Sequence, residues 1–256
     1  MPAQVYRDLL NVMQARRGPY AGMDIPEFYD LVEFLFTPEE AAINNALPPK
    51  PAAADHIART IGRNEAGMAR ALDEMTDKGL CATFVSNGVR VYRGVPFVPG
   101  IFEYQFMSGR ATPRERRIAE LIHAYQEAFN TAAGETRIKF PTARVIPVDR
   151  TIQAGNTIHT YDQVATYIDK YDTIGVGACY CRHTASLRGQ DTHGMPVDVC
   201  MWFGKGAEYA IERLGGRRLS KDEAIRMTAK PGFPTPPKDI AQLAVALKAS
   251  ASQPVE

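Results

Sequence analysis

Three of the four cysteines in this chain lie within one stretch, and their spacing is its strongest sign of chemistry. The stretch runs from Cys179 to Cys200 and reads CYCRHTASLRGQDTHGMPVDVC, whereas Cys81 lies far upstream. Thiolates are preferred ligands of soft centres such as zinc and iron–sulfur clusters. Cysteines that are used so sparingly and grouped so closely are therefore expected to act as ligands or as redox groups.

The spacing within the stretch predicts how these side chains meet. Cys179 and Cys181 are one residue apart. In extended backbone, residues i and i+2 project to the same side, so both sulfur atoms are expected to reach one centre. A loop must then bring Cys200 back to the pair. The candidate ligands for a cluster or a metal are Cys179, Cys181, His193 and Cys200.

Three interpretations of this set stay open. An iron–sulfur cluster is held by thiolates, and histidine can replace cysteine at a raised potential. A zinc site of three cysteines and one histidine is also chemically reasonable, although C-x-C departs from the usual C-x₂-C spacing. The third interpretation is that the cysteines are small buried apolar groups. That is the role we expect for Cys81, which opens a predicted strand.

Two neighbours of the cysteines are candidates for tuning such a centre. Arg182 and His183 flank the thiolates and are expected to supply hydrogen bonds or positive charge, which shifts a potential; a purely structural role is the alternative for each. If His193 is a ligand, its titration near neutral pH links proton transfer to electron transfer. If it is not, one iron is left open to water or a substrate, and the site is a candidate for catalysis.

Seven short segments together resemble one known family. They are FTPEEA (36–41), KGL (78–80), PFVPGIFE (96–103), RVIPV (144–148), CYCRH (179–183), PVDVC (196–200) and SKDEA (220–224). The chain resembles, over most of residues 4–228, the winged-helix-containing 4Fe-4S-binding proteins of anaerobes, which are associated with ferredoxin-like domains. The resemblance implies a [4Fe–4S] cluster. The chain departs from the family pattern at His193, where a cysteine is usual, and it lacks further C-x₂-C-x₂-C runs.

The composition limits the other classes of function. The 256 residues carry a formal net charge of +1, which gives no general attraction to nucleic acid or anionic lipid. The N-terminus lacks the apolar segment of a signal peptide, and no apolar run is long enough for a membrane span. We therefore expect a cytoplasmic protein, in which clustered cysteines more often bind metal than form disulfides.

The pattern of apolar and turn residues predicts an α+β fold in two parts. Residues 1–110 are expected to form a helical N-terminal half with a winged-helix module at about 53–93. In that module Asn64 caps a second helix, and Asn87-Gly88 turns a β-hairpin. Residues 111–256 are expected to form a smaller metal or Fe–S-binding domain with the cysteine loop 179–200. Its predicted elements are a long helix over 113–131, a strand over 173–177, and helices over 204–214 and 220–229.

The predicted function is single-electron transfer, or a redox accessory role, for a partner oxidoreductase. No P-loop, G-x-S-x-G or H-E-x-x-H motif suggests another chemistry, so whether the chain is itself an enzyme is left open. The alternative is a zinc-stabilised or redox-sensing winged-helix regulator that binds DNA or protein. Nucleic acid is the less favoured partner because the expected recognition helix, 65–78, is rich in acidic residues. Homo-oligomerisation is left open.

Overall fold

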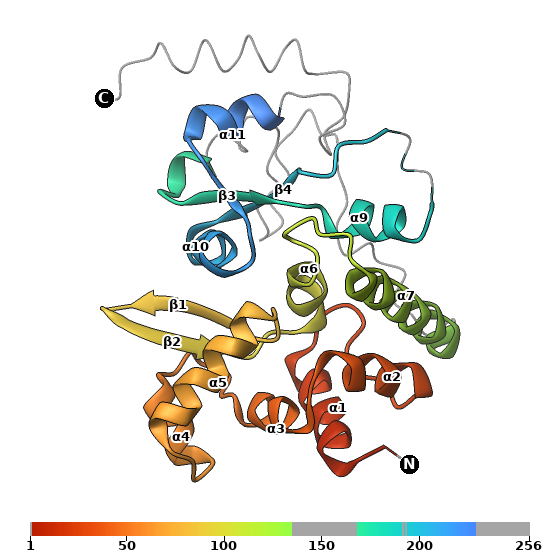
Figure 1. Ribbon diagram of the computed structural model, residues 1–256, viewed down its shortest axis with the longest axis vertical. Helices are drawn as coiled ribbons and strands as arrows, with labels where there is room; N and C mark the ends of the chain where they lie inside the picture. The colour runs from red at the N-terminus through yellow and green to blue at the C-terminus, as the bar shows by residue number, and fades with distance from the viewer. Residues whose placement is uncertain (1, 135–167, 191, 193, 229–256) are drawn as a thin grey trace, which may run out of the picture.

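The computed structural model describes residues 2–134, 168–190, 192 and 194–228. The RVIPV segment and the position of His193 therefore lie outside the described residues. Within the described part, helices are mixed with two small antiparallel sheets, which is an α+β arrangement (Figure 1). None of the described helices has both the length and the apolar composition that a bilayer span requires.

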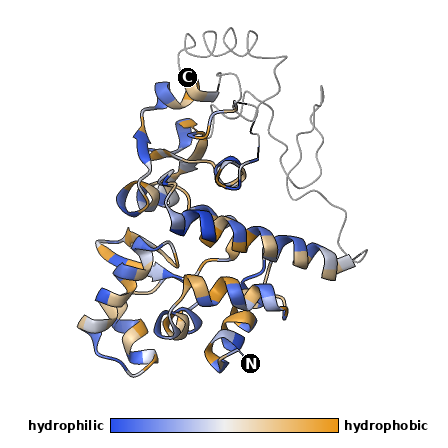
Figure 2. Ribbon diagram, turned by 45° about the vertical axis from the view of Figure 1, so that its right-hand side comes forward, coloured by the Kyte–Doolittle hydropathy of each residue, from blue (hydrophilic) through white to orange (hydrophobic). Residues whose placement is uncertain are grey.

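Four helices with one apolar face each form the N-terminal layer. They are α1 (Gln4–Arg16), α2 (Pro26–Leu35), α3 (Pro38–Ala46) and α7 (Pro113–Ala133). Helix α2 packs against α7, and α1 packs against α3. Thr37 and Glu40 form a reciprocal capping box at the start of α3. Figure 2 shows hydrophobic and hydrophilic residues alternating along the ribbons of these helices, as expected for helices that are buried on one face.

Two helices and a hairpin follow in the predicted order. They are α4 (Ala54–Thr60), α5 (Glu65–Asp77), β1 (Ala82–Ser86) and β2 (Val89–Arg93). The Asn64 side chain accepts a hydrogen bond from the Gly67 N–H at 3.1 Å, so the predicted cap is confirmed. Asn87 and Gly88 both adopt positive φ, as a two-residue hairpin turn requires. Ala52 adds a short antiparallel bridge to Tyr92 of β2.

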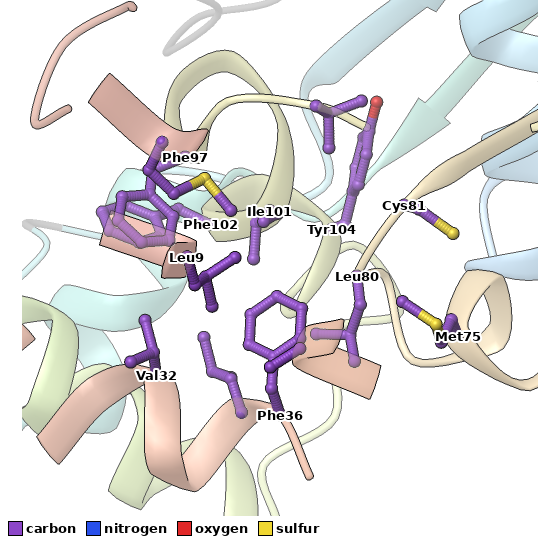
Figure 3. Packing of buried hydrophobic residues seen from close by; sticks show 14 of the residues in the cluster. Leu9, Val32, Phe36, Met75, Leu80, Cys81, Phe97, Ile101, Phe102 and Tyr104 are labelled. Atoms are coloured by element: carbon purple, nitrogen blue, oxygen red, sulfur yellow. The ribbon is translucent and has the colours of Figure 1, made fainter. Parts of the chain in front are cut away.

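An aromatic connection joins the hairpin to α7. It consists of η1 (Phe97–Ile101), whose backbone is extended at its centre, and the short helix α6 (Phe102–Tyr104). The rings of Phe97 and Phe102 stack with centroids 4.9 Å apart, and Phe97 also contacts Tyr125 of α7. Figure 3 shows Phe97 and Phe102 in one cluster with Leu9, Val32 and Phe36. This segment is therefore part of the main buried cluster.

The C-terminal part is built around a three-stranded sheet. Its elements are β3 (Ile174–Gly177), α9 (Tyr180–Leu187), β4 (Cys200–Phe203), α10 (Gly204–Arg213), β5 (Arg217–Leu219) and α11 (Lys221–Thr228). Strand β3 lies between β4 and β5 and is antiparallel to both. Helix α10 packs on β3 and β4, and it also contacts β1 of the hairpin (Figure 1).

Apolar packing is divided unequally between the two ends of the chain. The main cluster runs from Tyr6 to Leu214 and includes Tyr180 and Tyr209 of the C-terminal part. The second cluster is small and is confined to the outer side of the three-stranded sheet; its buried members are Ile168, Ile174, Val176, Leu219 and Ala224. The hydroxyl of Tyr209 lies 2.7 Å from the carbonyl oxygens of both Thr76 and Cys81, which ties α10 to the hairpin module.

Candidate functional site

The turn from β3 into α9 brings the two ends of the cysteine stretch together. Gly177 at the end of β3 pairs with Cys200 at the start of β4. Two residues on, the backbone N–H of Cys179 donates to the Val197 carbonyl at 2.7 Å. These backbone contacts return the loop to the point where α9 begins, as the spacing of the cysteines predicts (Figure 1).

Cys179 and Cys181 meet through a helix start. The expectation of extended backbone over these residues is wrong: Cys179 is the N-cap of α9, and Cys181 lies in the first helical turn. The two side chains nevertheless lie close enough for each to shift the pKa of the other. A helix N-terminus supplies unpaired backbone N–H groups, and those of Cys181 and Arg182 lie near enough to the Cys179 sulfur to lower its pKa.

This arrangement separates the pKa values of the two thiols. The neighbouring Cys181 side chain, the backbone N–H groups and the Arg182 charge together lower the pKa of Cys179 to about 6, against the opposing effect of burial. The neighbouring Cys179 side chain, with burial, raises the pKa of Cys181. At neutral pH the pair therefore holds a thiolate at Cys179 and a thiol at Cys181, and the thiolate is the form that binds metals.

Cys200 completes a group of three sulfur atoms. Burial and the negative charge of Cys179 raise the pKa of Cys200 to about 11, and its charge in turn acts on Cys181. Both effects require Cys200 to lie near the pair. Cys181 is exposed, whereas Cys179 and Cys200 are half-buried. The backbone thus returns Cys200 to the end of β3 from which Cys179 and Cys181 follow, and the fourth predicted ligand, His193, lies outside the described residues.

The geometry of the described side chains is that of a thiol pair with a third thiol beside it. Across residues 2–134, 168–190, 192 and 194–228, no three His, Cys, Asp or Glu side chains are arranged to hold a metal ion. The side-chain chemistry fits a soft centre, because the three residues that the loop brings to this end of β3 all offer sulfur. One polar atom also lacks a partner there: the buried indole N–H of Trp202 makes no hydrogen bond of normal geometry. It lies close enough to Cys200 to lower the pKa of that thiol.

Arg182 and His183 lie beside the thiols and have different contacts. The Arg182 guanidinium donates to the Pro196 carbonyl at 2.6 Å, so it holds the returning loop as well as lowering the pKa of Cys179. His183 is buried, and its Nε2 lies 2.8 Å from the Arg110 carbonyl oxygen, which can only accept. That contact places a proton on Nε2, so this nitrogen is engaged as a hydrogen-bond donor.

Glu103 is a neighbour of the thiols that the sequence reasoning missed. Its carboxylate accepts a hydrogen bond from the Gly100 N–H at 2.7 Å, and burial raises its pKa. Its negative charge contributes to the raised pKa values of both Cys181 and Cys200. The available signal was a single acidic residue within the apolar segment 95–106. For Trp202, the signal was the only tryptophan of the chain, two residues after Cys200.

A pocket adjoins the thiol site from the sheet side. Its volume is about 750 Å³, and its lining includes Ala178 and Val199, which directly precede Cys179 and Cys200. Met107 and Val176 give it apolar walls, and Arg217 contributes the positive charge at its rim. The thiol site therefore has a space of small-molecule size beside it.

Cys81 is separate from this site. It is fully buried in the main cluster, where burial raises its pKa to about 12, and the predicted structural role is consistent with that position (Figure 3).

Comparison of the chain with protein families, with curated proteins and with solved structures gave no match. The resemblance to winged-helix-containing 4Fe-4S-binding proteins consequently stays a prediction from the seven short segments.

Proposed function

We propose that this chain is an iron–sulfur protein that passes single electrons to or from a partner oxidoreductase. The observation that supports it best is the convergence of Cys179, Cys181 and Cys200 at the start of α9. These three residues, with His193 as the fourth ligand, would hold a cluster of the [4Fe–4S] type. When bound, such a cluster supplies a one-electron redox centre.

The protein groups around the thiols suit that role. Backbone N–H groups at the start of α9 lie near enough to Cys179, and the indole N–H of Trp202 near enough to Cys200, to lower the pKa of each thiol. Hydrogen bonds to cluster sulfurs raise a reduction potential, and the nearby Glu103 carboxylate opposes them. The exposed Cys181 leaves one edge of the site accessible to a partner.

A zinc site on the same residues is the alternative within this proposal. Three thiolates and one imidazole form an ordinary closed tetrahedral shell. Zinc has no redox chemistry, so its role would be to stabilise the C-terminal part rather than to carry electrons.

The helix–helix–hairpin segment supports a second, regulatory candidate through protein contacts. We infer that it is a winged-helix module whose helix α5 is engaged within the chain. Arg213 of α10 pairs with Asp73 and Asp77 of α5, each at 3.0 Å. Arg90 of the hairpin pairs with Glu212 at 2.6 Å. These contacts and the acidic face of α5 favour docking to protein over binding to DNA.

Anaerobic purification of the full-length chain tests these alternatives. The proposal predicts a brown protein with a broad visible absorption band and matched amounts of iron and sulfide. A colourless protein with one zinc per chain would refute electron transfer by this site. If the iron is present, the variant His193→Cys should keep it and lower the reduction potential, because cysteine is the more electron-donating ligand. An unchanged potential would show that His193 is not a ligand.

A further inference from the structure

The pocket beside the three-stranded sheet lies on the face opposite α10. Figure 1 shows α10 and α11 on opposite sides of β3. Side chains alternate along a strand, and a side chain at Gly175 would come within 3.2 Å of Ile211 in α10. Ile174 and Val176 therefore project from the other face. Both are buried there in one cluster with Ala224 of α11, and Val176 also forms part of the wall of the pocket, whose volume is about 750 Å³.

Arg217 of β5 projects from the same face as the pocket. It is the register partner of Val176, and residues opposite each other on neighbouring strands project to the same side. Arg218 instead pairs with Gly175, so its side chain starts on the face that α10 covers. Two adjacent arginines thus have different positions, and it is Arg217 that lines the pocket.

The guanidinium of Arg217 has one edge available for a ligand. Its Nη1 atom lies 3.5 Å from the Arg218 carbonyl oxygen and 3.5 Å from one Glu223 carboxylate oxygen. The other carboxylate oxygen of Glu223 is engaged at the start of α11, where it accepts from the N–H and the hydroxyl of Ser220. Among the described residues, none bonds to Nε or Nη2 of Arg217. A guanidinium binds a carboxylate through two such parallel N–H donors.

The rest of the lining is largely apolar and includes one acid. Met107, Val176 and Met227 supply apolar surface. Asp198 is exposed on the returning loop, and no cation of the described residues pairs with it. Its negative charge disfavours a ligand with a second negative group. An apolar wall with one available cation therefore fits a ligand that combines a single carboxylate with a hydrocarbon body.

We propose that this pocket binds a small monocarboxylate with an apolar body. The carboxylate accepts from Nε and Nη2 of Arg217, and the body packs on Val176 and Met227. The side chain of Cys200 lies on the other face of the sheet, because Cys200 pairs with Gly177, two residues on from Gly175. Binding in the pocket is consequently independent of the proposed electron-transfer function.

The test is a nuclear magnetic resonance titration of the full-length chain, purified anaerobically, with isotope-labelled methionine methyl groups. Phenylacetate is the probe. It should shift the methyl signals of Met107 and Met227 and leave those of Met13 and Met75, which are buried in the main cluster. Two matched compounds divide the ligand: 2-phenylethanol keeps the apolar body and acetate keeps the carboxylate. Each should bind at least about 10-fold more weakly than phenylacetate.

Variants of the two arginines locate the carboxylate. Arg217→Gln should raise the dissociation constant of phenylacetate at least about 10-fold and leave that of 2-phenylethanol unchanged. Arg218→Gln is the matched control, since it removes the same charge on the other face and should bind as the parent does. Arg217→Lys keeps the charge without the two parallel donors and should bind with intermediate affinity. The Arg217 side chain is 59% exposed, so these variants should fold, which circular dichroism measures.

Three results would overturn the proposal. They are binding of acetate or 2-phenylethanol as tight as that of phenylacetate, parental affinity in Arg217→Gln, and methyl shifts at Met13 and Met75 in place of Met107 and Met227. None of these results bears on iron or sulfide content. Absence of iron from the parent would refute the electron-transfer proposal and leave the pocket assignment standing, so the two proposals fail separately.

Discussion

The N-terminal layer and the thiol site are held together by different kinds of interaction. Around Phe97 the chain buries aromatic rings that stack on one another or meet edge to face. Around Cys179 the contacts are backbone hydrogen bonds, one guanidinium contact to a carbonyl and a small apolar cluster. Apolar burial is the main source of folding free energy, so the first region contributes the larger share of it. Under the proposed function, metal binding would add stability to the second.

Removing one thiol should have the largest effect and should affect only one region. The variant Cys179→Ala is expected to lose nearly all bound iron, because the lowest-pKa ligand is gone, while the helices of the N-terminal layer remain folded. Iron analysis and far-ultraviolet circular dichroism measure the two outcomes. The matched control Cys81→Ala should keep its iron and lose about 1 kcal/mol of unfolding free energy. Iron retained by Cys179→Ala would contradict the ligand assignment.

Truncating one aromatic ring should lower the stability of the N-terminal layer. Phe97→Ala is expected to cost about 3–5 kcal/mol of unfolding free energy, since the ring is buried against three others. Urea denaturation provides the measurement. Phe34→Ala, at a side chain that is 43% exposed, should change stability by no more than about 0.5 kcal/mol. Equal losses in the two variants would show that the aromatic segment does not form the core.

The two regions should also differ in thiol chemistry when the protein is free of metal. Because the pKa of Cys179 is lowered to about 6, its alkylation by iodoacetamide should rise with pH through about 6 and level off above it. Below that pH the thiol is protonated and slow to react. Cys81, whose pKa is raised to about 12 by burial, should stay unmodified in the same sample. Mass spectrometry of digests measures the alkylation of both cysteines. The variant Arg182→Ala should raise the pH midpoint of Cys179 alkylation, because the guanidinium charge lowers the pKa of this thiol. Equal labelling of both cysteines at pH 7 would contradict this.

The smallest expected effect concerns the ion pairs between the regions. Arg213→Ala removes contacts with both Asp73 and Asp77, which are partly exposed, so the cost in unfolding free energy should be about 1 kcal/mol. A double-mutant cycle with Asp73→Ala isolates the coupling, and Arg226→Ala on α11 is a control. A coupling of zero would mean that α10 is held to α5 by Tyr209 and apolar contacts alone.

Local features of the fold could be predicted from the sequence, and long-range ones could not. The cap at Asn64 and the Asn87-Gly88 turn depend on residues three or fewer positions apart, and both are confirmed. The grouping of the three cysteines was also predictable, because a loop of that length has to return. The conformation that joins Cys179 to Cys181 was not, since tertiary contacts of the β3–α9 turn select a helix start over extended backbone.

The residues that surround the thiols were the least predictable part. Glu103 lies more than seventy positions from Cys179, and only the folded arrangement of η1, α6 and α9 brings its charge near the sulfur atoms. The pairing of Arg213 with Asp73 has the same character, at a separation of 140 positions. A single sequence carries no period or spacing that signals such contacts.

The path of the chain from Cys200 to Arg213 indicates where a fluorescent label could report on the thiol site. Strand β4 passes into α10 through Gly204 alone, whose φ is +57° and whose free space is closed by the Tyr171 ring. The C-terminal end of α10 pairs with α5 through Arg213 and with the hairpin through Glu212. Under the proposed function Cys200 is a ligand, so a dye at the hairpin tip, joined to the site through β4 and α10, tests whether loading of the site reaches the hairpin without any label near the sulfur atoms.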